Sequence, residues 1–184
     1  GNIFVGDEAT AERIQVFSPD GKFLRRFALK GNLPGMILRP HGMQFDAEGR
    51  LFVDDVDNFR ISVYDHSGKF LYSWGHGGLY PGGLNPPHGL ALDKNDDVFV
   101  NSFYGPAQKF TADGKFLKAF AYADPPDGPI IYHTLNGDRW GDVLQVVEVL
   151  KPDPKNYISI QKFNDNGDFV TNLRMSTSDR SAMW

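Results

Sequence analysis

The sequence contains no cysteine, and this absence excludes disulfide bonds, thiolate catalysis and cysteine-bound zinc. Any metal ion must therefore be bound by histidine, carboxylate or carbonyl ligands. There is no surplus of positive charge either, because 19 lysine and arginine residues stand against 23 aspartate and glutamate residues, for a net charge of -4. We therefore expect no nucleic-acid partner and no membrane partner. No apolar run approaches the roughly 18 residues of a membrane-spanning helix.

Helical periodicity is also missing, and short alternating runs take its place. Runs such as RISVY (60–64) and DVFVN (97–101) alternate β-branched or aromatic residues with a period of two, which is typical of strands. Asp-Gly, Ser-Gly and Asn-Gly pairs between the runs tolerate positive φ and predict tight hairpins. Since 41% of the residues are hydrophobic, the chain can bury a core, and the sequence predicts a folded all-β protein.

One phrase recurs along the whole chain. It reads FSPDGKFL at 17–24, YDHSGKFL at 64–71, FTADGKFL at 110–117 and, more loosely, FNDNGDFV at 163–170. Its glycines follow one another after 47, 46 and 53 residues. The turn-rich segment KPDPKN at 151–156 accounts for the longer last step. A period of this length indicates a repeat architecture with four copies.

A complete copy, best seen over residues 40–74, contains four predicted strands, at about 41–46, 50–54, 60–65 and 69–74. Four antiparallel strands in roughly 45 residues make one propeller blade. The sequence therefore predicts a β-propeller of four-stranded antiparallel blades in a single domain, 1–184. We expect the repeats at about 1–38, 39–84, 85–130 and 131–173, with a tail at 174–184.

The second copy, PHGMQFDAEGRLFVDDVDNFRISVYDHSGKFLYSWG, resembles an NHL repeat. This resemblance implies a six-bladed ring, of which four repeats would form part. The chain opens at GNIFVGD (1–7), which corresponds to the second strand of a blade. Either the tail supplies the missing inner strand, or the chain is a piece that lacks about two blades; we favour the piece. An incomplete ring would leave a strand edge unpaired, which predicts self-association.

Three histidines occupy one slot of the repeat, near the start of each predicted inner strand. They are His41 in PHGMQFD, His88 in PHGLALD and His133 in YHTLNGD. Inner strands line the channel of a propeller, so three imidazoles could hold zinc and leave a fourth position for water. Adjacent blades of a six-bladed ring would bring ligand nitrogens too close together, so His41 and His133 form the better pair. The alternative is that the duplicated histidine hydrogen-bonds to a carbonyl of the neighbouring blade.

The three histidines resemble those of the peptidyl-α-hydroxyglycine amidating lyases, which are NHL-type propellers. That resemblance implies zinc held by His41, His88 and His133, together with a structural calcium; it assigns no catalytic acid or base here. A second set of candidates follows the second strands: Asp7, Asp54, Asp55 and Asn101. These side chains either pair with Arg13 and Arg60 or cap the turn. Alternatively, the resemblance to gluconolactonase-like propellers implies a calcium site with Glu8 and Asn101.

Two functions stay open on the sequence alone. The first is a metal-dependent lyase or hydrolase that takes a small molecule or a peptide in the channel. The second is a non-catalytic NHL scaffold that presents its loop face to a protein, peptide or glycan partner. The compartment is open as well, with an extracellular or periplasmic location favoured.

Overall fold

The computed structural model describes residues 1–103, 105–120, 130–138, 140–150 and 157–176. Its strands form four antiparallel sheets, and within each sheet every strand pairs with the next strand along the chain. The sheets consist of β1 (Ile3–Asp7), β2 (Arg13–Phe17) and β3 (Phe23–Phe27); β4 (Pro40–Phe45), β5 (Leu51–Asp55), β6 (Arg60–Tyr64) and β7 (Phe70–Trp74); β8 (Pro87–Leu92), β9 (Val98–Ser102), β10 (Gly105–Phe110) and β11 (Phe116–Ala119); and β12 (Ile130–Gly137), β13 (Val143–Val149), β14 (Tyr157–Phe163) and β15 (Phe169–Ser176). Among the described residues, no helix has the length and apolar character needed to cross a membrane.

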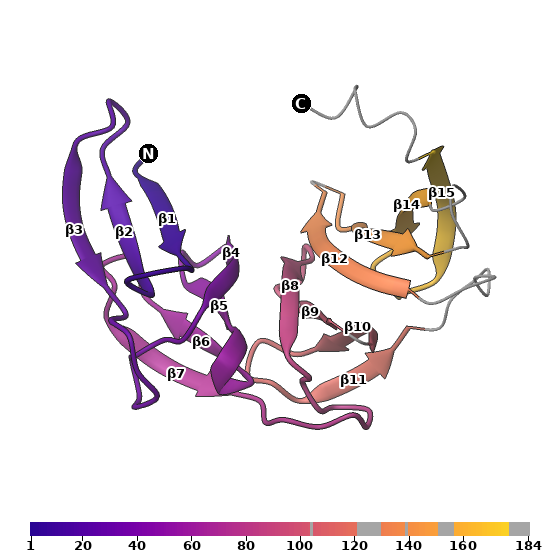
Figure 1. Ribbon diagram of the computed structural model, residues 1–184, viewed down its shortest axis with the longest axis horizontal. Coiled ribbons are helices and arrows are strands. Elements are labelled where there is room, and N and C mark those ends of the chain that lie inside the picture. The colour runs from indigo at the N-terminus through magenta and orange to yellow at the C-terminus, as the bar shows by residue number, and fades with distance from the viewer. Residues whose placement is uncertain (104, 121–129, 139, 151–156, 177–184) are drawn as a thin grey trace.

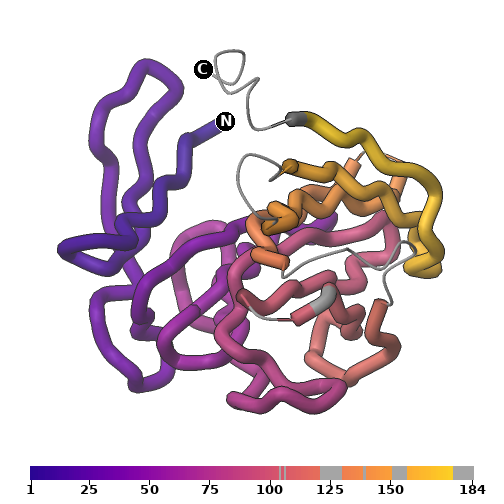
Figure 2. The backbone as a smooth tube through the Cα atoms, turned by 45° about the vertical axis from the view of Figure 1, so that its right-hand side comes forward, coloured from indigo at the N-terminus to yellow at the C-terminus, as the bar shows by residue number. Residues whose placement is uncertain are grey.

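The four sheets follow one another around an open arc, with the first and the fourth sheet on opposite sides of its gap (Figures 1 and 2). This is the arrangement of blades in a β-propeller, and the predicted fold class is confirmed. We call the sheets blades 1 to 4 in chain order. Blades 2, 3 and 4 have four strands, whereas blade 1 has three. The turn-rich segment 151–156 and residues 177–184 of the predicted tail lie outside the described residues.

The hydrophobic core is divided among the three junctions between blades. Blades 1 and 2 share a cluster around Ile14 and Tyr64, blades 2 and 3 share one around Phe52 and Phe110, and blades 3 and 4 share one around Phe99. Each cluster takes side chains from two neighbouring sheets, because the inward face of one blade can be buried only against the next blade. Stability therefore builds up junction by junction.

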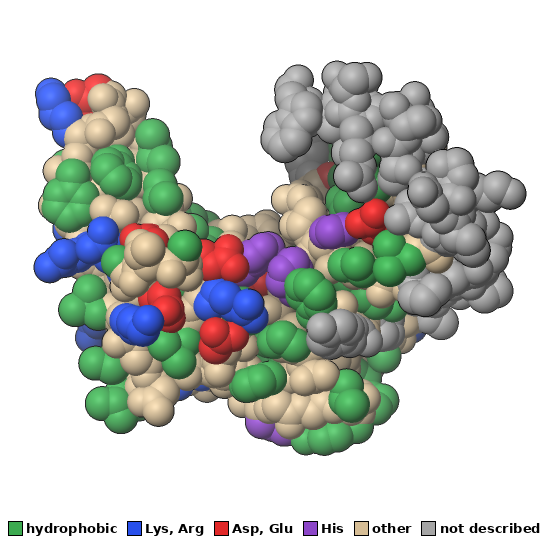
Figure 3. All heavy atoms as spheres, viewed as in Figure 1, with side chains coloured by type: hydrophobic (Ala, Val, Ile, Leu, Met, Phe, Trp, Pro, Cys, Tyr) green, Lys and Arg blue, Asp and Glu red, His purple; other side chains and the backbone are tan. Residues whose placement is uncertain are grey.

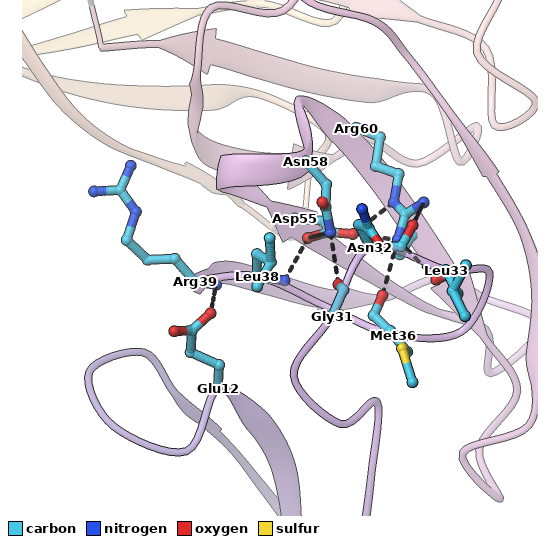
Figure 4. A network of polar contacts seen from close by, with 11 residues as sticks. Glu12, Gly31, Asn32, Leu33, Met36, Leu38, Arg39, Asp55, Asn58 and Arg60 are labelled. Carbon is cyan, nitrogen blue, oxygen red and sulfur yellow. Dashed lines mark hydrogen bonds and ion pairs between the residues drawn. The ribbon is translucent and has the colours of Figure 1, made fainter.

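The carboxylate of Asp55 fastens the linker between blades 1 and 2 to blade 2 (Figure 4). Asp55 is completely buried and accepts hydrogen bonds from the Leu38 backbone N–H at 2.7 Å, Asn58 Nδ2 at 2.8 Å, Arg60 Nε at 2.6 Å and Ser62 Oγ at 3.1 Å. The remaining nitrogens of Arg60 donate to backbone carbonyls in the same linker. Burial raises the pKa of Asp55, and the bonds from Leu38, Arg60 and Asn58 offset that effect in part.

The predicted pairing with Arg13 and Arg60 is confirmed for Asp7 and Asp55, whereas Asp54 has neither arginine as a partner. Asp7 pairs with Arg13 at 3.5 Å, and Asp55 pairs with Arg60. Asp54, the residue before Asp55, points to the other side of the strand and is completely buried. Among the described residues, neither carboxyl oxygen makes a hydrogen bond of normal geometry, and only the nearby Gly42 backbone N–H partly compensates for the burial. The reason is the period of a strand, which sends successive side chains to opposite faces.

Candidate functional site

A β-bulge lies at each of the three predicted histidine positions. The pairing of β4 with β5 shifts between Pro40 and Met43, that of β8 with β9 between Pro87 and Gly89, and that of β12 with β13 between Tyr132 and Leu135. A bulge inserts an extra residue and redirects its side chain. His41, His88 and His133 each fall inside such a shift, so the repeat places all three in equivalent, irregular positions of an inner strand.

The structure brings His41 and His88 into direct contact. Their rings stack with centroids 4.1 Å apart and an interplanar angle of 26°. Phe103 meets the His88 ring edge-on at 4.7 Å. Figure 3 shows histidine side chains along the hollow of the arc, beside acidic and basic side chains, and a further histidine at the lower edge of the molecule.

His88 also contacts blade 4. Its Nδ1 lies 2.8 Å from the backbone oxygen of His133. A carbonyl oxygen can only accept, so Nδ1 carries the proton and Nε2 keeps the lone pair of the neutral imidazole. The alternative interpretation, a histidine bonded to the carbonyl of a neighbouring blade, therefore describes His88.

The environment of His88 favours its neutral form. Burial lowers the pKa of His88, the bond to the His133 carbonyl raises it in part, and the neighbouring His41, His133 and Arg39 lower it further. The net effect is a pKa below the ordinary value of 6.5. A neutral imidazole with one nitrogen fixed as a donor presents a basic Nε2 in a known orientation.

His133 adds a carboxylate to the same region. Its Nε2 lies 3.6 Å from Glu148 Oε2, and the contact is an ion pair when the histidine is protonated. The sequence alone does not single out Glu148, because this residue stands within the largely apolar run VLQVVEV of β13. The pairing register of β12 with β13 would have identified Glu148. In that register Glu148 lies opposite Ile131, on the inner strand that also carries His133.

The three histidines are not arranged as a set of metal ligands. An imidazole lone pair lies in the plane of its ring, so two stacked rings direct their nitrogens side by side and not toward one point. Among the described residues, no group of three or more His, Cys, Asp or Glu side chains is placed to hold a metal ion. The expected calcium residues are also differently placed, because Asn101 is completely buried whereas Glu8 is exposed.

We expect the purified chain to carry no stoichiometric zinc. The His41 and His88 rings stack on each other, and His88 Nδ1 is bonded to the His133 carbonyl, so the imidazole nitrogens do not converge on one point. Metal analysis by plasma mass spectrometry would measure this. The same analysis of His41→Ala and His133→Ala serves as the control. One equivalent of zinc that disappears in both variants would contradict the expectation and establish the alternate-blade pair as ligands.

The chain is similar in structure to several proteins of known structure. No protein-family model matches the chain, and no curated protein matches it. Among solved structures, virginiamycin B lyase from Staphylococcus aureus is similar, with a TM-score of 0.60 and 11% identity over 96% of this chain and 66% of that chain. A catalytically inactive histidine-to-alanine variant of that lyase with quinupristin gives 0.56 and 11% identity, over 96% and 71%. A gluconolactonase-like protein gives 0.66 and 10% identity, over 96% and 60%.

These similarities establish the β-propeller fold and nothing finer, because one fold hosts many unrelated functions. The chain spans just under two thirds of the first lyase chain and 60% of the gluconolactonase-like chain.

Proposed function

We propose that the histidine face of the arc is an acid–base site for lyase-type bond cleavage. One observation carries the proposal: the bond from His88 Nδ1 to the His133 carbonyl leaves Nε2 as the basic nitrogen of a neutral imidazole. Burial keeps that imidazole neutral by lowering its pKa. A general base needs both properties, an available lone pair and a pKa near or below the working pH.

The neighbouring residues supply the complementary role. His133, paired with Glu148, is a proton donor in its charged form and lies one blade beyond His88. The ring of His41 stacks on the ring of His88 and so restricts its orientation. A base and an acid on adjacent inner strands can act on two atoms of one small ligand bound between them.

The chemistry that fits such a pair is elimination. With a hemiaminal substrate, His88 Nε2 removes the hydroxyl proton, the C–O bond becomes a carbonyl, and the C–N bond breaks. The proton of His133 goes to the departing amide nitrogen, so the products are an aldehyde and an amide. Transfer of the proton from His88 to His133 through water restores the starting state. No metal ion takes part in this scheme.

Two classes of substrate are supported by different observations. The NHL-like repeat and its histidine slot favour a peptidyl-α-hydroxyglycine, as cleaved by amidating lyases. The structural similarity to virginiamycin B lyase, whose histidine-to-alanine variant is catalytically inactive and was solved with quinupristin, favours quinupristin as the second compound to test.

The test is turnover of these two compounds by the purified chain, followed by mass spectrometry of the products. We expect His88→Ala to lower the rate by about 10²-fold or more, as is typical for loss of a general base. His66→Ala, which changes an exposed histidine in a hairpin, is the matched control and should leave the rate unchanged. A rate that is equal in His88→Ala and the unaltered chain would contradict the assignment of the base.

A second candidate, a binding scaffold without catalysis, rests on the linker between blades 2 and 3. Leu79 is 83% exposed and Tyr80 is 54% exposed. They border a cavity of about 170 Å³ that also reaches Asn85, Ser102 and Gln108. Its polar side chains bond mainly to the linker itself, so it offers chiefly apolar contacts, which suit a peptide side chain. Absence of turnover with both compounds, together with peptide binding lost in Tyr80→Ala, would favour this function.

A further inference from the structure

The three junctions within the arc are built in the same way around a hairpin glycine. Gly68, Gly114 and Gly167 each lie at positive φ, at 89°, 88° and 77°. A Cβ atom added to them would come within 2.6 Å of Phe27, 2.4 Å of Trp74 and 1.8 Å of Phe120 respectively. In every case the aromatic ring belongs to the outer strand of the preceding blade or follows it directly. Only glycine allows so close an approach.

The same hairpins accept hydrogen bonds from the preceding blade. The carbonyls of residues 66 and 67 accept from Arg25 at 2.6 and 3.0 Å. The carbonyl of Ala112 accepts from Tyr72 Oη and Trp74 Nε1 at 3.2 and 3.0 Å. The carbonyls of residues 165 and 166 accept from Lys109 and Lys118 at 2.7 and 3.0 Å. A junction therefore consists of a hairpin glycine against an aromatic side chain, with one or two hairpin carbonyls that accept two hydrogen bonds from the preceding blade.

Blade 1 carries the same hairpin, and nothing in the described chain covers it. Gly21 has a φ of 82°, like its three counterparts. No heavy atom of the described chain lies within 4 Å of the position of an added Cβ at Gly21. The carbonyls that correspond to the acceptors in the other blades are those of Pro19 and Asp20, and both residues are exposed. The hairpin has one half of a junction.

Blade 4 carries the other half. Phe27, Trp74 and Phe120 each stand four residues after the phenylalanine that opens the outer strand, and the corresponding residue of blade 4 is Leu173, which is 59% exposed. Lys162 corresponds to Lys109 in sequence and pairs with Asp138 and Asp142 as Lys109 pairs with Asp93 and Asp97. Its side chain is 29% exposed, against 11% for Lys109, which a hairpin covers.

We propose that these two halves bind each other between molecules, so that the hairpin 18–22 of one copy docks on β15 of a second copy. The contact would place Gly21 against Leu173 and direct Lys162 toward the carbonyls of Pro19 and Asp20, which continues the interface found at the three internal junctions. The two surfaces differ and lie at opposite ends of the arc (Figure 2). Such a contact is head-to-tail, so it repeats from copy to copy unless the ring closes.

Sedimentation velocity of the full chain over a range of concentrations tests this proposal. We expect the mass to rise with concentration above the 20.6 kDa of one chain. Gly21→Asn should reduce association at least tenfold, because asparagine tolerates positive φ but adds a side chain where the junction admits none. Leu173→Lys should reduce it as well, since it places a charge in an apolar contact.

The matched control is Gly49→Asn. Gly49 has a φ of 79° and likewise no heavy atom within 4 Å of an added Cβ, but it lies in a hairpin of a different kind, between β4 and β5. This variant should associate like the unaltered chain, and thermal melting of all variants verifies folding. A chain that stays monomeric at every concentration would overturn the proposal. Association that Gly21→Asn leaves unchanged would also overturn it, and would indicate pairing at the free edge of β1.

Discussion

Replacing Asp55 with alanine is expected to lower the free energy of unfolding by about 3–5 kcal/mol, as is typical when one partner of a buried ion pair is removed. The substitution leaves Arg60 without its carboxylate and removes the acceptor of the Leu38 N–H, so the linker between blades 1 and 2 loses its attachment (Figure 4). Urea unfolding at neutral pH measures the effect. The shift in the urea concentration at the midpoint, multiplied by the slope of unfolding free energy against urea concentration, gives the change in stability.

Asp57→Ala provides the control for this change. Asp57 also pairs with an arginine, Arg39, at 2.9 Å, but its side chain is 52% exposed. Exposed ion pairs contribute about 0–1 kcal/mol, so the control variant should unfold close to the unaltered chain. Equal destabilisation by the two substitutions would show that the Asp55 network does not hold the linker.

Asp54→Asn is expected to change how stability depends on pH. Burial raises the pKa of Asp54 from 3.8 to about 8, and the Gly42 backbone N–H offsets this only in part. The folded state thus holds the proton more tightly than the unfolded state does. Stability is therefore highest at low pH, falls as pH rises through 3.8, and levels off above about 8.

The loss of stability caused by Asp54 depends on how far the pH lies above 3.8, up to the folded-state pKa of about 8. Each unit between the two pKa values costs about 1.4 kcal/mol, so the penalty at pH 7 is on the order of 4 kcal/mol. An amide does not titrate, and the repeat already places Asn101 in the equivalent slot of blade 3, also completely buried. The difference in unfolding free energy between variant and unaltered chain should therefore grow by about 1.4 kcal/mol per unit between pH 5 and 7.

Urea titrations at several pH values give this difference directly. The reciprocal variant, Asn101→Asp, should introduce the same pH dependence into blade 3. A constant difference between Asp54→Asn and the unaltered chain from pH 5 to 7 would mean that the carboxyl group of Asp54 keeps an ordinary pKa in the folded protein.

Much of the fold was predictable, because each blade forms from strands that are adjacent in sequence. The four strands expected within residues 40–74 coincide with β4 to β7 to within about one residue. Alternation defines the strands, and the glycine turns define the hairpins. The blade number of the complete ring does not follow from this pattern, because a repeat reports its own length and not the angle between neighbours.

The candidate site was predictable in its residues and not in its geometry. The repeat identifies His41, His88 and His133 as equivalent, and the bulges confirm that they share one structural position. The repeat cannot reveal that two of the rings stack or that His88 bonds across a junction, since these contacts depend on side-chain rotamers. Glu148 was missed for a related reason, because it enters the site through pairing between strands.

The position of the site across three blades has a consequence for how a ligand would act on the whole arc. His41, His88 and His133 belong to blades 2, 3 and 4, and each blade otherwise rests only on its neighbours. A ligand that contacts all three would fasten two junctions at once and make their opening cooperative. At a hundred times its dissociation constant, such a ligand adds about 2.7 kcal/mol to stability. Supply of the ligand would then regulate the lifetime of the protein as well as the occupancy of its site.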